Sequence, residues 1–337
     1  MEPGRATPGV RIAGTGSALP SRVLTNADLT RLMDTSDDWI VQRTGIHTRY
    51  IVDPDKGEST PTLAAAALRI ALADARTQPA EVDLLICATM TPNMSCPATA
   101  CQVADLCGIC SGGAFDLNAA CSGFVFALNM AHASIRGGLH KTIAIVGADT
   151  LSKHMSYTTA GRSTAIIFGD GAAAAILRAT DDPTKGLLAQ AMRCDGSGWK
   201  DIYVPELDRD FPPATAPDPA KLARVQMNGA GVFKFAVGTF PRLIEETLEK
   251  ARLGPSDIDM YVCHQSNARI LGAARDRFDI PEEKLYINIG RVGNTVGASV
   301  PLCLDELRRA GRVRDGHKVM FLAFGGGLTW GSSLWQL

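Results

Sequence analysis

Residues 75–88 read ARTQPAEVDLLICA, and residues 251–264 read ARLGPSDIDMYVCH. At an offset of 176 positions, the two stretches share Ala, Arg, Pro, Asp and Cys. A second pair, HKTIAIVGA starting at His140 and HKVMFLAFG starting at His317, matches at an offset of 177. Two separate matches at nearly one offset indicate an internal repeat, so the chain is predicted to consist of two similarly built halves.

Short apolar runs alternate with helix-patterned segments in both halves, which we place at residues 1–180 and 181–337. Runs such as 82–88 (VDLLICA) and 142–146 (TIAIV) are typical of strands that are buried on both faces, and an Ala/Leu-rich helix is expected at 64–75. Alternation of this kind predicts an α/β fold whose parallel or mixed sheets are covered by helices.

The composition excludes several classes of protein. Hydrophobic residues make up 46% of the 337 positions and charged residues 20%, which supplies two domain-sized cores and gives no reason to expect disorder. The formal net charge is −1, so binding to nucleic acid is not expected as a property of the whole chain.

Neither a membrane span nor a signal peptide is expected. The charge-free run 117–135 contains Asn, Ser and His residues that would be costly in lipid, so it fits a helix buried inside the protein. The first 14 residues, MEPGRATPGVRIAG, contain no apolar stretch of signal-peptide length. We therefore expect a cytoplasmic protein, with its nine cysteines as reduced thiols.

Two weak motifs are interpreted as structural. Gly14 and Gly16 imitate a dinucleotide-binding fingerprint, but the third glycine is missing, so a turn at the end of a strand is the better interpretation. Cys107 and Cys110, with Cys101 nearby, lack the second ligand pair that a zinc site needs. We expect buried structural thiols there and no metal site.

Cys121 is the first candidate for chemistry. It lies between an expected strand, AFDLN at 114–118, and an expected helix at 122–136. At the N-terminus of a helix, free N–H groups and the helix dipole stabilise a thiolate and are expected to lower the pKa of the thiol. A core cysteine packed between alanines is the alternative interpretation.

Three further features could complete such a site. His264 directly follows the apolar run 260–263, at the end of a strand where catalytic side chains are presented. Asn294 is flanked by glycines, and residues 325–327 are three consecutive glycines that would let a backbone N–H approach a ligand closely. A histidine held in a turn, a turn-forming asparagine and a plain glycine corner remain the structural alternatives.

Taken together, these pieces resemble the β-ketoacyl-[acyl-carrier-protein] synthase III family of the thiolase superfamily. The resemblance runs nearly end to end, and its most specific stretches are DTSDDWIVQRTGI (34–46), NAACSGF (118–124), HQSNARI (264–270), GNTVGASVPLCLDE (293–306) and AFGGGLTWGS (323–332). It implies a thiolase-like fold, in which two duplicated α/β halves stack as α-β-α-β-α layers. This agrees with the internal repeat.

The resemblance also implies a reaction, the decarboxylative Claisen condensation that initiates fatty-acid synthesis. Cys121 would take an acyl group from acyl-CoA, while the backbone N–H groups of Cys121 and Gly326 bind the oxyanion. Malonyl-acyl carrier protein would then lose CO₂, and His264 and Asn294 would donate hydrogen bonds to the enolate oxygen. His264 could donate in its protonated form or in the correct neutral tautomer. Neither a metal nor a bound cofactor is expected.

Family positions that contact the two substrates carry over to this sequence. Trp39 and Arg162 match residues that sandwich the CoA adenine. The CoA tunnel is matched by Thr35, Arg43 and Asn267.

Lys234 and Arg269 match a basic patch that docks the acidic carrier protein, although a plain surface lysine is an equally good interpretation of Lys234. Cys96 occupies a position where many members have a large aromatic residue that reaches across a homodimer into the acyl pocket. A smaller residue there predicts a deeper pocket and tolerance of longer or branched acyl primers.

Other functions remain open. A close rival is a family member of secondary metabolism, which would prime a polyketide or transfer an acyl group without condensation. Condensation is favoured because pure acyl transfer does not need the enolate-stabilising Asn294. A catalytically silent subunit of a heterodimer would usually lose its nucleophile, so Cys121 argues against that class. A homodimer is the family expectation.

Overall fold

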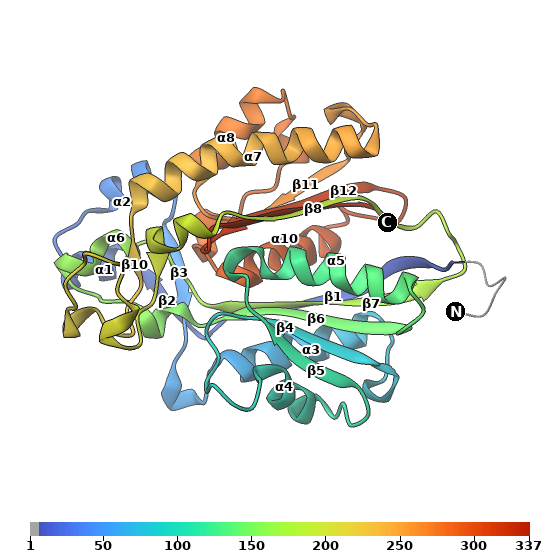
Figure 1. The fold of residues 1–337 in the computed structure, drawn as a ribbon, viewed down its shortest axis with the longest axis horizontal. Helices are drawn as coiled ribbons and strands as arrows, with labels where there is room; N and C mark the ends of the chain where they lie inside the picture. Colours follow the sequence, from blue (N-terminus) through green and yellow to red (C-terminus); the bar gives the residue numbers. More distant parts are fainter. Residues whose placement is uncertain (1–6) are drawn as a thin grey trace.

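Five layers make up the computed structural model, which describes residues 7–337 (Figure 1). Residues 1–6, at the start of the first predicted half, lie outside the described residues. The first sheet has the strand order β1-β7-β6-β4-β5, and the second has the order β11-β12-β13-β8. All strands of the first sheet precede residue 181 and all strands of the second follow it. The exact boundary between the halves stays a prediction.

Both sheets are mixed, as expected. In the first, β4 is parallel to β5 and β6, whereas β7 is antiparallel to β6 and β1; in the second, β11 is parallel to β12 and the other pairs are antiparallel. The strands are β1 (Gly9–Ala18), β4 (Leu84–Ala88), β5 (Gly113–Leu117), β6 (Thr142–Asp149), β7 (Gly171–Thr180), β8 (Gly186–Cys194), β11 (Met260–Cys263), β12 (Lys318–Gly325) and β13 (Thr329–Gln336).

Helices form the three remaining layers. In Figure 1, α3 and α4 cover the outer face of the first sheet, α7 and α8 cover the outer face of the second, and α5 and α10 lie between the sheets. Their bounds are α3 (Thr60–Asp74), α4 (Thr99–Cys107), α5 (Gly123–Arg136), α7 (Gly229–Ala251), α8 (Ala268–Arg277) and α10 (Ser299–Arg309).

Smaller elements gather at one end of the layers, at the left of Figure 1. They form two short antiparallel pairs, β2 with β3 and β9 with β10, together with four short helices. These are β2 (Arg22–Thr25), β3 (Thr48–Ile51), β9 (Ile202–Tyr203), β10 (Gln226–Met227), α1 (Asn26–Leu32), α2 (Asp37–Thr44), α6 (Arg162–Ala165) and α9 (Ile289–Val292).

The central helix α5 is apolar on nearly every face because both sheets pack against it. Phe124, Leu128 and Ile135 are fully buried in the core between the sheets. Each such side chain contributes roughly 1.5–3 kcal/mol by leaving water. The charge-free run therefore forms an internal helix, as predicted.

The aspartate that occurs in both copies of the repeat makes the same contact in each half. Asp83 accepts hydrogen bonds from the backbone N–H groups of Lys141 (2.6 Å) and Thr142 (2.9 Å), so it ties the start of β4 to the start of β6. In the second half, Asp259 accepts the N–H of Lys318 at 2.7 Å, and the same link joins β11 to β12. The same hydrogen bonds from an aspartate to the start of the neighbouring strand thus set the strand pairing in both sheets.

The expected turn at Gly14 and Gly16 is wrong, because both glycines lie inside strand β1. A Cβ on Gly14 would come within 2.3 Å of the Ala75 nitrogen, and a Cβ on Gly16 within 2.5 Å of the Ala67 oxygen. The glycines are therefore needed for close packing of β1 against α3 and its end.

The expectation of buried thiols at Cys101, Cys107 and Cys110 is only partly correct. Cys107 is buried at the end of α4, but Cys101 and Cys110 are exposed. Cys101 lies on the outward face of α4, and Cys110 lies in the loop before β5. All nine cysteines of the chain are free.

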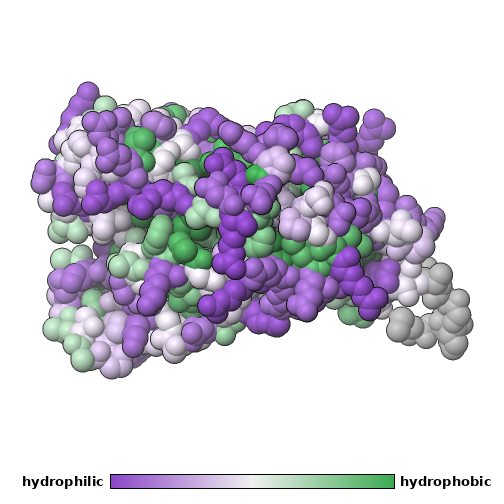
Figure 2. Space-filling model, turned by 90° about the horizontal axis from the view of Figure 1, so that it is seen from above, coloured by the Kyte–Doolittle hydropathy of each residue, from purple (hydrophilic) through white to green (hydrophobic). Residues whose placement is uncertain are grey.

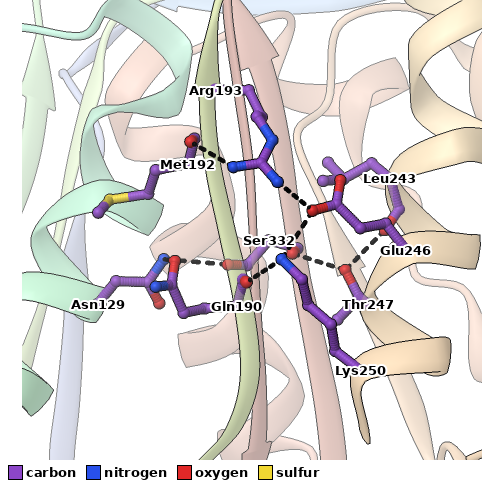
Figure 3. Close-up of polar contacts among 9 residues, drawn as sticks. All are labelled: Asn129, Gln190, Met192, Arg193, Leu243, Glu246, Thr247, Lys250 and Ser332. Atoms are coloured by element: carbon purple, nitrogen blue, oxygen red, sulfur yellow. Dashed lines mark hydrogen bonds and ion pairs between the residues drawn. The ribbon is translucent and has the colours of Figure 1, made fainter. Parts of the chain in front are cut away.

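Polar contacts tie three layers together across the second sheet (Figure 3). On the inner side, the amide of Asn129 on α5 donates to the Ser332 carbonyl at 3.0 Å. On the outer side, the buried Thr247 hydroxyl on α7 donates to the Leu243 carbonyl and lies 2.6 Å from the Ser332 hydroxyl. A residue of β13 therefore has polar partners on both covering helices.

Replacing Thr247 by valine is expected to lower the free energy of unfolding by about 1–3 kcal/mol, because the Ser332 hydroxyl loses a buried partner while the packed volume hardly changes. Urea unfolding measures this difference. Thr215→Val is the matched control, since Thr215 is exposed and its expected effect is within about 0.5 kcal/mol. Equal unfolding midpoints for the two variants would contradict the prediction.

Candidate active site

Cys121 lies in a short 3₁₀ turn, Ala120–Ser122, between β5 and α5. Its side chain is buried, and Ala120 before it has a left-handed backbone with φ 45°. The backbone of this turn presses against the end of β12. A Cβ on Gly325 would lie 2.8 Å from the Cys121 nitrogen, so only glycine fits there. The predicted position between strand and helix is correct, with the helix beginning at Gly123.

The expected low pKa of Cys121 is wrong. Burial, reinforced by the negative charge of Asp149, raises the pKa of the Cys121 thiol to about 12. The position at a helix start predicted the contribution of the helix dipole to the pKa. It could not predict the burial of the thiol, which disfavours the charged thiolate more strongly. In the free protein, Cys121 is therefore a neutral thiol.

His264 follows β11 directly and is almost completely buried, with 1% of its surface exposed. Its backbone N–H donates to the Leu322 carbonyl at 2.8 Å, and its ring meets the ring of Phe324 edge-on, with centroids 5.6 Å apart. Burial lowers the pKa of His264 to about 3, so the imidazole is neutral at physiological pH. Of the two predicted donor forms, burial therefore favours the neutral Nε2–H tautomer over the protonated one.

Stability should depend on pH through this histidine. Its pKa is about 3 in the folded state and ~6.5 in the unfolded state, so only the unfolded state takes up a proton as the pH falls below 6.5. This proton uptake favours unfolding. Between pH 7.5 and pH 5 the protein is expected to lose about 2 kcal/mol more than a His264→Gln variant. Urea unfolding at both pH values gives the difference, and parallel losses in the two proteins would contradict it.

Asn294 is buried, and its amide is held in one orientation. Its Oδ1 accepts the N–H of Val296 at 2.9 Å, while its backbone N–H donates to the Ile167 carbonyl at 3.0 Å. Since the oxygen is occupied, the NH₂ group is the end left to donate. Val296 has φ 52°, a rare backbone conformation for a β-branched residue, so the surrounding structure must hold this turn in place.

Two cavities meet at Cys121. The front cavity, of about 100 Å³, is lined by His264, Asn294, Phe233, Asn267, Phe324 and Gly325. The rear cavity, of about 450 Å³, is lined by Met90, Asn118, Leu151, His154, Val204 and Glu206. Cys121, Phe168, Ile202 and Gly326 line both. The predicted group of Cys121, His264, Asn294 and Gly326 therefore comes together around one cavity, with the thiol at the boundary to a second.

Gly326 borders both cavities, and its backbone N–H has no hydrogen-bond partner within residues 7–337. That N–H is available for a ligand, as an oxyanion-binding group would have to be. A Cβ on Gly326 would meet Ile202 at 3.3 Å, which is tight but not prohibitive.

Replacing Gly325 by alanine is expected to reduce Cys121 acylation by about 100-fold, because the new Cβ would displace the Cys121 backbone, and small displacements of reacting groups have effects of this size. Gly326→Ala is the matched control. It keeps the N–H and should lose less than about 10-fold. Rates from mass spectrometry of acylated protein decide the order, and a greater loss for Gly326→Ala would contradict it.

The predicted CoA residues lie close together beside the front cavity. The guanidinium carbons of Arg43 and Arg162 lie 4.2 Å and 5.1 Å from the ring centroid of Trp39. Stacked atoms lie ~3.5–4 Å apart, so an adenine between two partners needs about 7 Å. The gap between Trp39 and Arg162 is therefore too narrow in this structure for the predicted adenine to enter. Arg162 instead donates a hydrogen bond to the Asp34 carbonyl at 2.5 Å.

Asn267 and Thr35 complete this group. Asn267 caps the start of α8 and donates to the Arg43 carbonyl at 2.8 Å, which joins α8 to the end of α2. The hydroxyl of Thr35 is buried and has no hydrogen-bond partner among the described residues. The roles of these residues toward CoA stay predictions.

Lys234 on α7 and Arg269 on α8 are both exposed. The guanidinium of Arg269 lies 5.5 Å from the ring centroid of Phe233, which lines the front cavity. The face that carries α7 and α8 is largely hydrophilic, with hydrophobic groups visible between the polar ones (Figure 2). Cys96 is exposed and lines neither cavity of its own chain, so its predicted contribution to an acyl pocket is not made within one chain.

Sequence reasoning missed three residues of the site. Phe168 lines both cavities and pairs with Asn294 in an isolated β-bridge. Gly325, rather than Gly326, makes the closest approach to Cys121. Asp149 is completely buried and affects the pKa of Cys121. The one sequence signal for Asp149 was its position at the end of an apolar strand, in the stretch GADT (147–150).

In residues 7–337, no three His, Cys, Asp or Glu side chains are grouped so that they could hold a metal ion. None of the helices in that part of the chain has the length and apolarity needed to span a membrane.

Comparison with family models gives two matches, at residues 115–196 to 3-oxoacyl-[acyl-carrier-protein (ACP)] synthase III and at residues 248–337 to the C-terminal part of the same enzyme. Among curated proteins, the β-ketoacyl-[acyl-carrier-protein] synthase III of Caldanaerobacter subterraneus subsp. tengcongensis is 42% identical over 323 residues, 96% of each chain. The enzyme of the same name from Chelativorans sp. is 43% identical over 327 residues, covering 96% of this chain and 98% of the relative.

Solved structures agree. The 3-oxoacyl-[acyl-carrier-protein] synthase III of Aquifex aeolicus VF5 is 38% identical and superposes with a TM-score of 0.89, covering 98% of this chain and all of that one. The priming β-ketosynthase from the R1128 polyketide biosynthetic pathway is 33% identical with a TM-score of 0.88, covering 99% of this chain and 98% of that one. The thiolase-like fold expected from the sequence is therefore confirmed.

Proposed function

Since this chain belongs to the β-ketoacyl-[acyl-carrier-protein] synthase III family and is a condensing acyltransferase, we propose that Cys121, His264 and Asn294 divide its reaction between them. One observation carries this assignment: the thiol, the imidazole, the amide and the Gly326 N–H border a single cavity. The substrates proposed are an acyl-CoA and malonyl-acyl carrier protein. No bound cofactor is proposed, because acyl-CoA is consumed as a substrate.

Acyl transfer comes first. The Cys121 sulfur attacks the thioester carbonyl of acyl-CoA, and the carbonyl oxygen becomes an oxyanion that the N–H groups of Cys121 and Gly326 bind. The carbon–sulfur bond to CoA breaks, and the proton of the Cys121 thiol leaves with the CoA thiol. Deprotonation costs free energy because the pKa of this thiol is raised, so oxyanion binding has to offset it.

Condensation follows at the same sulfur. The malonyl group loses CO₂, and the electron pair of the broken C–C bond forms an enolate whose oxygen accepts hydrogen bonds from His264 and Asn294. The enolate carbon then attacks the acyl carbonyl on Cys121, the new C–C bond forms, and the Cys121 thiolate leaves. A neutral His264 suits this role because it donates a hydrogen bond without giving up its proton.

Acyl primers longer than acetyl are proposed from the rear cavity. Its volume of about 450 Å³ is many times the ~10–15 Å³ that one water-sized group occupies by the same measure, so it exceeds the space that a two-carbon group needs. The same observation favours a second candidate function, priming of a polyketide, for which the 33% identity to the R1128 priming β-ketosynthase is further support.

A homodimer is proposed as the working form. Strand β5 is the outer strand of its sheet, and its Phe115 is 36% exposed. An outer strand with an exposed aromatic residue is a ready surface for pairing with a second copy. Cys96, which contacts neither cavity of its own chain, would then be placed to reach the partner. Light scattering of the purified protein measures the mass.

The partners and compartment follow the sequence expectations. Exposed Lys234 and Arg269 beside the front cavity are proposed to attract the acidic carrier protein. A cytoplasmic location is proposed because all nine cysteines are free. A net charge of −1 supports neither nucleic acid nor an anionic membrane as a partner.

Intact-protein mass spectrometry tests this function. The protein is incubated with acyl-CoAs of increasing length and branching, and malonyl-acyl carrier protein is then added. An adduct on Cys121 that becomes β-ketoacyl-acyl carrier protein is expected, with primers beyond acetyl accepted. An adduct that passes only to another acceptor would replace condensation by simple acyl transfer. A steep fall in rate beyond acetyl would overturn the proposed primer class.

A further inference from the structure

We propose that Asp149 is a positioning residue, which fixes the Asn294 loop against the segment that follows β4 and is needed for condensation more than for acyl transfer. This inference rests on the proposed division of the reaction. Asp149 is the last residue of β6, is 0% exposed, and makes no salt bridge with any described residue.

The Asp149 carboxylate has neutral donors from two separate segments. Its Oδ2 accepts the backbone N–H of Gly297 at 2.9 Å. Its Oδ1 accepts the N–H of Met90 at 2.9 Å and the hydroxyls of Thr91 and Thr89 at 2.9 Å and 3.2 Å. One carboxylate therefore joins the segment after β4 to the segment after Asn294. A buried charge satisfied in this way is costly to disturb.

The hydrogen bond between Gly297 and Asp149 affects the orientation of the Asn294 amide. The N–H that orients the Asn294 amide comes from Val296, which has the rare φ of 52° and directly precedes Gly297. Holding the Gly297 N–H fixes the peptide that follows Val296. Without that hydrogen bond, Val296 can relax toward a common conformation, and its N–H then turns away from the amide oxygen of Asn294.

Close backbone packing leaves this loop little alternative space. A Cβ on Gly147 of β6 would lie 2.2 Å from the Gly297 oxygen, so strand and loop touch backbone to backbone. A Cβ on Gly297 would lie 3.0 Å from the Asp149 carboxylate and 3.1 Å from the Ala88 oxygen. The loop is therefore clamped between β4 and β6, and Asp149 supplies the directional contact.

The hydrogen bond from Gly297 to Asp149 supports Asn294, whereas the negative charge of Asp149 disfavours the thiolate form of Cys121. Burial first, and then this carboxylate, raises the pKa of Cys121. Burial and Asp116 raise the pKa of Cys87 on β4, and Asp149 adds to them. Burial lowers the pKa of Lys153, and Asp149 opposes this. Removing the charge should make the thiolate easier to form, while loss of the Gly297 contact should impair Asn294. The two half-reactions therefore respond differently, which a merely structural role would not cause.

The test uses Asp149→Asn. Asparagine keeps a single acceptor oxygen, which the three donors that now bind Oδ1 retain, so its NH₂ group faces the Gly297 N–H and cannot accept it. The charge is lost, while the volume is unchanged. Acylation of Cys121 by acyl-CoA is expected to stay within about 3-fold of wild type or to rise. Decarboxylation of malonyl-acyl carrier protein is expected to fall at least about 30-fold. Alkylation of Cys121 by iodoacetamide, followed at the peptide level, should reach half its maximal rate at a lower pH.

Asp305→Asn is the control, because Asp305 is also a buried carboxylate with two hydroxyl donors. Its partners Thr15, Ser17 and Arg309 line neither cavity, whereas Asp149 binds Met90, which lines the rear one. The Asp305→Asn variant should leave the ratio of the two half-reactions and the alkylation profile unchanged. Equal losses of acylation and decarboxylation in Asp149→Asn, or an unmoved alkylation profile, would overturn the proposal.

If Asp149→Asn does not fold, Thr91→Val withdraws one donor from the same carboxylate. A selective loss of decarboxylation of about 3–10-fold is then expected, and equal losses in both half-reactions overturn the inference. Failure of the wild type to acquire an acyl group from any acyl-CoA would be different, since it would refute the proposed function itself.

Discussion

Replacing Cys121 by serine is expected to reduce acyl transfer from acyl-CoA by about 10⁴-fold or more, in the range seen when a catalytic nucleophile is removed. A hydroxyl is a weaker nucleophile than a thiol unless a base activates it. His264, the candidate base that shares the front cavity, has its pKa lowered to about 3 by burial, so it cannot accept the proton effectively at neutral pH. The measurement is the rate at which the intact protein gains the mass of the acyl group.

Two further observations make the Cys121→Ser result specific. Decarboxylation of malonyl-acyl carrier protein without condensation should persist, because His264 and Asn294 are unchanged. Cys303→Ser is the control, since Cys303 is also buried but lies on α10 outside both cavities, and acylation should be retained. Full acylation of Cys121→Ser on another cysteine would refute the assignment.

Replacing Asn294 by aspartate is expected to reduce condensation about 10²–10³-fold while acylation of Cys121 stays within a few-fold of wild type. The substitution preserves shape, and the remaining oxygen can still accept the N–H of Val296. It removes the NH₂ donor and sets an oxygen against the enolate, and losing one preorganised donor has an effect of this size. Single-turnover assays that start from preformed acyl-Cys121 measure condensation alone.

Asn129→Asp provides the comparison for Asn294→Asp. Asn129 is also buried, but its amide binds the Ser332 carbonyl between α5 and β13 (Figure 3). That variant should lose stability without changing the ratio of condensation to acylation. If Asn294→Asp slowed both steps equally, the amide would be supporting the turn rather than the enolate.

The architecture could be predicted because the repeat carries structural information locally. Asp83 and Asp259 each join two strand starts within their own half, so the same residues recur wherever that link recurs. Strands and buried helices were recognisable for a similar reason: both faces are covered, and the apolar runs are therefore continuous. His264 and Asn294 were found because each stands at a chain reversal next to an apolar strand or among glycines.

Features that depend on distant packing could not be predicted. The role of Gly14 was predicted wrongly because a glycine is required there by the packing of Ala75, at the end of a helix, and not by the neighbours of Gly14 in sequence. The pKa of Cys121 is set by burial and by Asp149, and a local motif indicates neither. Asp149 itself has partners 58 to 148 positions away, so its contacts exist only after folding.

The position of Cys121 at the boundary of two cavities also sets the order of events. If the acyl chain moves into the rear cavity, the front cavity stays free for the second thioester, which has to reach the same thiol. Cys121 carries one acyl group at a time, so the two thioesters reach it in turn. Turnover is then ping-pong, with CoA departing before the carrier protein can deliver its malonyl group. Excess carrier protein should consequently compete with acyl-CoA and slow the first step.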